Sequence, residues 1–152
     1  MRAQLMVLVG LLFGGALWAG PADQSIDGIL KDYFKIHTAL AQDSTEGVAT
    51  AAQSITQKAT SIRTTDPEVQ KLLTQITIAS RDFEASSLDK ARDSFFELSK
   101  PLLAYLNQFH AQKDQYYRYF CTMKQRAWIQ PEKETQNPYT GQAMLGCGQL
   151  IK

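Results

Sequence analysis

The chain has 152 residues and is nearly neutral, with 16 Lys and Arg against 15 Asp and Glu. This balance excludes the strongly basic surface of a nucleic-acid-binding domain, and no run of like charges indicates a membrane-surface helix. The length fits one domain with one hydrophobic core, and the sequence contains no internal repeat or low-complexity linker.

The N-terminus has the pattern of a secretory signal peptide. A positive start precedes an uncharged apolar run over residues 5–18, and small residues follow before Asp23, the first acid. The run is shorter than the ~20 residues of a membrane-spanning helix. We therefore expect residues 1–22 to be a signal peptide and residues 23–152 to be a single periplasmic or secreted domain, with no membrane association after cleavage.

Four amphipathic patterns follow between Ser25 and His110, each with apolar residues at three- and four-residue steps. Ser25 is a candidate cap for the first, which carries His37 on its apolar face. The other helix starts predicted from local signals are Asp43 with Glu46 as a capping-box pair, Asp66 before Pro67, and Ser86 or Ser87.

The fourth pattern contains Pro101, which is expected to kink or break the helix because proline lacks a backbone donor. Four amphipathic helices joined by short turns predict a mainly α fold, an antiparallel four-helix bundle.

The pattern changes after His110. Residues 116–128 are rich in aromatic side chains with strand propensity, and proline and glycine punctuate the remainder. Asn137, Pro138, Tyr139 and Gly141 form a turn motif, in which proline fixes one dihedral angle and glycine supplies a positive one. We expect a short strand, an irregular loop around Trp128 and a second short strand, packed as a tail on the bundle.

All cysteines lie in this tail, together with the only methionines outside the N-terminal apolar segment. They form two clusters, Cys121-x-Met123 and Met144-x-x-Cys147. Methionine used only for packing is more often scattered through the helices. Thiolate and thioether ligands are soft and favour Cu(I) or Ag(I), whereas zinc prefers four Cys or His ligands. The four sulfurs are therefore candidate metal ligands if the two clusters meet.

Three further side chains are candidates near such a site. His37 and His110 can each add an imidazole ligand, and Trp128 can cover the ion. The alternatives stay open: a buried histidine with a hydrogen-bond partner for His37, a helix C-terminal residue favoured by the helix dipole for His110, and core packing for Trp128.

The tail motif resembles a bacterial domain family of unknown function. The residues that carry the resemblance run from Cys121-x-Met123 through Trp128 and Asn137-Pro138-Tyr139-x-Gly141 to Met144-x-x-Cys147-Gly148. That family includes small exported proteins and extra domains on periplasmic adaptor subunits of copper and silver efflux systems of the Cus type. Thr122 departs from the family, which usually has proline there. The resemblance implies metal-related periplasmic biology.

A second interpretation remains open for the two cysteines. An even number of cysteines in an exported chain is typical of a disulfide, and a Cys121–Cys147 bond would stabilise the fold by ~3–4 kcal/mol on the chain-entropy model. The methionines would then only pack in the core.

Catalysis has little support, because the sequence contains no nucleophile elbow, zinc-protease motif or phosphate-binding glycine loop. We therefore expect a non-enzymatic accessory protein that binds Cu(I) or Ag(I). The alternative is a disulfide-stapled interaction module without metal. The expected partner is a heavy-metal efflux adaptor or another envelope protein.

The signal pattern makes a direct prediction about the exported product. Cleavage after Ala19 or Ala22 should leave a soluble protein in the periplasmic fraction, since these small residues follow the apolar run. Intact mass spectrometry measures the missing segment, and a full-length, membrane-bound product would contradict the prediction.

Overall fold

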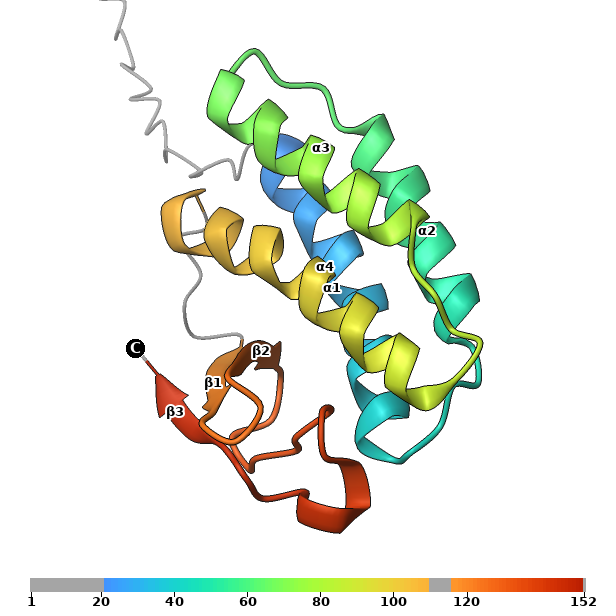
Figure 1. Cartoon of the computed structure of the whole chain (residues 1–152). Helices are drawn as coiled ribbons and strands as arrows, with labels where there is room; N and C mark the ends of the chain where they lie inside the picture. The colour runs from blue at the N-terminus through green and yellow to red at the C-terminus, as the bar shows by residue number, and fades with distance from the viewer. Residues whose placement is uncertain (1–20, 110–115, 152) are drawn as a thin grey trace, which may run out of the picture.

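The computed structural model of the chain describes residues 21–109 and 116–151. It is mainly helical, with a small antiparallel sheet at its C-terminal end (Figure 1). The elements in chain order are α1 (Pro21–Ala41), α2 (Val48–Ser61), α3 (Pro67–Arg81), α4 (Leu88–Phe109), β1 (Tyr117–Cys121), β2 (Arg126–Gln130), the 3₁₀ helix η1 (Gly141–Met144) and β3 (Gln149–Ile151). His110 lies outside the described residues, and so do residues 1–20, which make up most of the expected signal peptide.

The helix starts agree with local sequence signals at two positions. The Asp66 carboxylate accepts hydrogen bonds from the backbone N–H groups of Glu68 and Val69, as expected for the residue that caps α3. Ser87 accepts a bond from the Lys90 backbone N–H just before α4.

Two local expectations were wrong. Helix α1 begins at Pro21, before Ser25. Helix α2 is preceded by Gly47 in a left-handed conformation and has no side-chain cap, because Asp43 bonds elsewhere. The break that was one of the two outcomes expected at Pro101 does not occur, because helix α4 continues through this buried proline.

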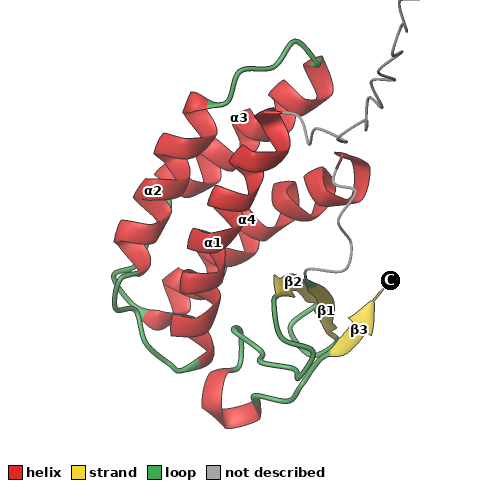
Figure 2. Cartoon of the chain, turned by 180° about the vertical axis from the view of Figure 1, so that it is seen from behind, coloured by secondary structure: helices red, strands yellow, loops and turns green. Residues whose placement is uncertain are grey.

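The tail contains one strand more than predicted. The segment around Trp128, predicted as a loop, is strand β2, which pairs antiparallel with β1 through a turn at residues 122–125. Strand β3 pairs with the other edge of β1, so the sheet order is β2-β1-β3. Seen from behind, the sheet lies beside α4, on the side away from α2 (Figure 2).

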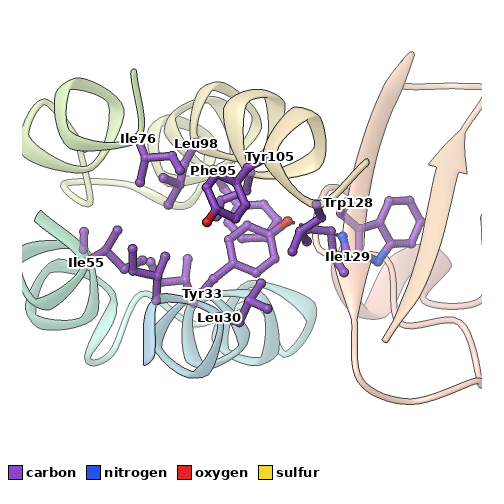
Figure 3. Packing of buried hydrophobic residues seen from close by; sticks show 14 of the residues in the cluster. Leu30, Tyr33, Ile55, Ile76, Phe95, Leu98, Tyr105, Trp128 and Ile129 are labelled. Atoms are coloured by element: carbon purple, nitrogen blue, oxygen red, sulfur yellow. Dashed lines mark hydrogen bonds between the residues drawn. The ribbon is translucent and has the colours of Figure 1, made fainter. Parts of the chain in front are cut away.

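The tail and the helices share one hydrophobic core, which confirms that the tail packs on the helical part. Helix α1 contributes Tyr33, whose ring stacks on Phe95 of α4 at 4.6 Å between centroids. In Figure 3, Ile129 of β2 points toward these rings, whereas the Trp128 ring lies on the sheet side. Trp128 is fully buried, as expected, but its ring neighbours Tyr119 and Tyr139 belong to the tail.

A buried chain of hydrogen bonds fixes the sheet to the helices. The Ile129 backbone N–H donates to the Tyr33 hydroxyl at 3.3 Å, which donates to Ser99 Oγ at 2.7 Å. Ser99 Oγ in turn donates to the Phe95 carbonyl. Because an unpaired buried N–H costs about 1–3 kcal/mol, Tyr33 satisfies an edge strand that would otherwise need water.

Helices α1 and α2 are joined by a buried carboxylate. Asp32 accepts hydrogen bonds from Lys35 Nζ at 2.7 Å, Ser54 Oγ at 2.6 Å and Lys58 Nζ at 2.5 Å. Burial alone would raise the pKa of Asp32, but these bonds outweigh it and lower the pKa from 3.8 to about 2. The carboxylate therefore contributes stability only while it is ionised.

The Asp32 interaction predicts an acid-dependent loss of stability. Since the folded pKa lies below the unfolded one, the contribution is complete above pH ~4 and disappears as the pH falls toward 2. Asp32→Asn should remove about 1–2 kcal/mol at pH 7, because the two lysines are partly exposed and solvent screens them. Chemical denaturation from pH 7 to pH 2 measures this.

The control is Asp89→Asn, which changes an exposed carboxylate on α4. That variant should keep the acid-dependent loss of the parent protein. If Asp32→Asn also keeps it unchanged, the assignment to Asp32 is wrong.

Candidate functional site

Three of the four candidate sulfur atoms come together in the tail. Cys121 ends strand β1, Met123 lies in the turn that follows, and Cys147 follows η1. The two cysteine Sγ atoms are 3.8 Å apart, and Cys147 Sγ lies 4.0 Å from Met123 Sδ. Both cysteines are free thiols. We call Cys121, Met123 and Cys147 the sulfur triad.

Met144 has a different setting. Its side chain is 44% exposed, and no hydrogen bond in the described part of the chain joins its sulfur to a thiol. Its backbone carbonyl accepts bonds from the Cys147 N–H and the Thr140 hydroxyl. Met144 therefore shapes the turn before Cys147, and its role as a ligand remains a prediction.

The two thiols differ in their readiness to ionise. Burial by itself would raise the pKa of Cys121, but the Lys124 backbone N–H, the Asn137 amide and the Cys147 thiol stabilise the thiolate, so the pKa is lowered. The pKa of Cys147 is raised, first by its hydrogen bond to Cys121 and then by desolvation. Cys121 is thus the thiol of the pair that loses its proton more readily.

Asn137 organises the loop that brings Cys147 to Cys121. Its side-chain Oδ1 accepts hydrogen bonds from the backbone N–H groups of Tyr139 at 2.8 Å and Thr140 at 3.3 Å. Its Nδ2 donates to the Cys147 carbonyl, and its own N–H donates to the Leu145 carbonyl at 2.8 Å. This fully buried side chain therefore connects the predicted turn to the triad.

A junction with the helices holds the same turn from outside. Arg92 of α4 donates to the Pro138 carbonyl at 2.8 Å and to the Asp43 carboxylate at 2.6 Å. The other Asp43 oxygen accepts from the Gln142 backbone N–H. Gly141 has φ +54, and a Cβ there would lie 1.8 Å from Asp43 Oδ1, so the motif requires glycine at this position.

Arg92 and Lys124 were missed by the sequence analysis. Arg92 acts on residues 46 and 49 positions away in the chain, and no short-range pattern marks such a contact. Lys124 acts through its backbone N–H, which any residue except proline supplies.

The Trp128 ring packs next to Cys147, against Gly148. A Cβ added at Gly148 would lie 2.5 Å from the Trp128 ring, so the ring packs directly against the residue after Cys147. The indole N–H donates to Gln130 Oε1 at 2.9 Å. These contacts assign Trp128 a packing role behind Cys147.

His37 also has a structural contact, with the backbone of the tail. It is fully buried, and its Nε2 donates to the Gln136 carbonyl at 2.8 Å. Desolvation lowers its pKa, so the ring is neutral at pH 7. The contact ties α1 to the residue before Asn137, and no hydrogen bond in the described residues joins His37 to the sulfur triad.

Within the described residues, no three His, Cys, Asp or Glu side chains gather into a metal-binding group. A groove of about 820 Å³ lies between α3 and α4, lined by apolar side chains such as Ile78 and Phe96. None of the sulfur atoms lines it.

Of the helices described, none is long and apolar enough to cross a membrane.

The comparisons with known proteins give one match. A family model described as "Protein of unknown function (DUF3347)" matches residues 29–114, and no curated protein and no solved structure matches the chain. The matched region begins within α1, covers the rest of the helices and ends before β1, so the sulfur triad lies outside it.

The contacts of Asn137 predict two effects. Asn137→Ala should raise the pKa of Cys121, because it removes an amide donor to the thiolate, and should destabilise the fold by about 1–3 kcal/mol, because buried N–H groups lose their acceptor. Asn137→Asp keeps that acceptor but replaces the donor to the Cys147 carbonyl by a buried carboxylate oxygen, so it should raise the thiol pKa through its charge and also destabilise the fold. Thiolate ultraviolet absorbance against pH and chemical denaturation measure the two effects.

Asn107→Ala, at an exposed position of α4, is the control and should change neither quantity. An unchanged Cys121 pKa in both Asn137 variants would show that the amide does not stabilise the thiolate.

Proposed function

The chain belongs to the DUF3347 family of proteins of unknown function, and from the geometry of the sulfur triad we propose that it binds Cu(I) or Ag(I) as a non-enzymatic accessory protein of the periplasm. The observation that carries the proposal is the pair of sulfur separations, 3.8 Å and 4.0 Å. Three ligands around one ion, with metal–sulfur bonds of about 2.3 Å, lie about 4 Å from one another.

The chemistry of the donors supports the same ion. Two thiols and one thioether form a soft set, which favours Cu(I) and Ag(I) over oxygen-seeking cations. The thiolate is the metal-binding form of cysteine, and Cys121 is the thiol whose pKa is lowered. Binding would require both thiols to lose their protons, and Cys121 would lose its proton more readily.

In this proposal the helical part is an antiparallel four-helix bundle that serves as a scaffold. It holds the turn of the tail through Arg92 and the strand β2 through Tyr33. The expected location rests on the signal-peptide pattern of residues 1–22. A heavy-metal efflux adaptor or another envelope protein is the proposed partner, on the basis of the resemblance of the tail motif.

The second candidate is a disulfide-stapled interaction module. The observation that favours it is the same 3.8 Å separation between two free thiols, since a disulfide needs the sulfurs to approach to about 2 Å. An oxidising compartment would supply the conditions. In that case the tail would be fixed covalently and no ion would bind.

Competition with a Cu(I) chelator tests the proposal on reduced protein. The parent protein should bind one Cu(I) in preference to Zn(II), and Cys121→Ser should abolish binding. Met123→Leu should weaken binding by about tenfold, equivalent to ~1.4 kcal/mol, with little loss of stability because leucine nearly conserves the volume.

Met144→Leu is the matched control, because Met144 is the other exposed methionine of the tail. It should leave the affinity unchanged if the triad is the complete ligand set. Equal affinities in the parent protein and Met123→Leu would exclude a thioether ligand. A reduced protein that binds no Cu(I) would leave the disulfide-stapled module as the better account.

A further inference from the structure

The three sulfurs of the triad are exposed to very different degrees. Cys121 is fully buried, Cys147 is partly buried, and the Met123 side chain is 60% exposed. A site that stores an ion usually encloses it, as closed four-ligand structural metal sites do. Here one ligand is buried and another stands in solvent, so the site has an open side.

The buried side of the triad is the fixed one. Cys121 lies in a strand paired on both edges, with Arg126 opposite it on β2. Backbone N–H groups of the following turn and the Asn137 amide surround its sulfur. Cys147 is held through its carbonyl by Asn137 and through its N–H by Met144.

The open side is the adjustable one. Met123 lies in the exposed turn 122–125, whose Gln125 has a positive φ of 53. A thioether is an uncharged ligand, so its departure from the ion leaves no bare charge behind. Of the three sulfurs, Met123 is therefore the one that an incoming ligand can replace first.

Resting on the proposed function, we infer that the triad is a transfer site, which passes Cu(I) or Ag(I) by ligand exchange to an acceptor carrying thiolate or thioether sulfur that approaches from the Met123 side. In the first step an acceptor sulfur bonds to the ion as the bond to Met123 Sδ breaks. In the second step another acceptor sulfur replaces Cys147, which takes up a proton from solvent.

The last bond to break is that to Cys121, which leaves as the thiolate. The ion keeps its +1 charge throughout, so no oxidant or reductant takes part. Burial fits this order, because Cys121 is fully buried whereas Cys147 is only partly buried and is reached first by an acceptor from solvent.

The test measures how the transfer rate depends on the concentration of the acceptor. Reduced full-length mature protein is loaded with one Cu(I), then mixed rapidly with excess bathocuproine disulfonate, a coloured Cu(I) chelator that serves as the probe. Ligand exchange predicts an observed rate constant that rises in proportion to chelator concentration. A rate constant independent of chelator concentration would overturn the inference, because it would show that the ion first dissociates.

Two variants identify the ligand that is replaced first. Met123→Leu should increase the second-order rate constant several-fold, because no thioether has to be displaced, while Met144→Leu should match the parent protein. Equal rate constants for the parent protein and Met123→Leu would contradict the proposed order.

Loading is measured before transfer, which separates the two claims. Failure of the reduced protein to load one Cu(I) refutes the proposed function and the inference together. Loading followed by concentration-independent release refutes the inference alone.

Discussion

The candidate site depends on the turn from Asn137 to Gly141. From inside, Asn137 binds the backbone of Tyr139 and Thr140 and the carbonyl of Cys147. From outside, Arg92 binds the Pro138 carbonyl. The Tyr139 ring lies between Phe95 of the helices and Trp128 of the sheet, with centroids 5.9 Å from each. Because the turn is fixed on both sides, the position of Cys147 is decided by packing that neither thiol supplies.

This arrangement divides the work between the two parts of the chain. The helices hold the tail through the Tyr33 hydroxyl, which accepts from β2, and the Arg92 guanidinium, which donates to the turn. The tail provides all three sulfurs of the triad. The family match covers the scaffold and not the triad, so membership of the family and the sulfur chemistry are independent observations.

The features that were predicted from sequence are those with local causes. Asp66 caps α3 because its carboxylate reaches the backbone N–H groups of the next residues, and the glycine at position 141 of the turn motif supplies the positive φ. Asp43 was misassigned as a helix cap because its partner Arg92 lies 49 residues away. Strand β2 was missed because Trp128, Ile129 and Gln130 are all buried, so the strand lacks the alternation of apolar and polar residues that marks a strand in a sequence. The sequence analysis expected Cys121 and Cys147 to meet if the turn brought the two clusters together, but the approach of Met123 to Cys147 depends on tertiary packing.

X-ray absorption spectroscopy of the reduced protein loaded with one Cu(I) tests the central claim most directly, because it reports the ligands of the ion itself. The triad predicts a first shell of three sulfur atoms, and Met123→Leu should reduce that shell to two, while Met144→Leu should leave it at three. A shell containing nitrogen or oxygen in the parent protein, or a shell of two sulfurs unaffected by Met123→Leu, would contradict the account.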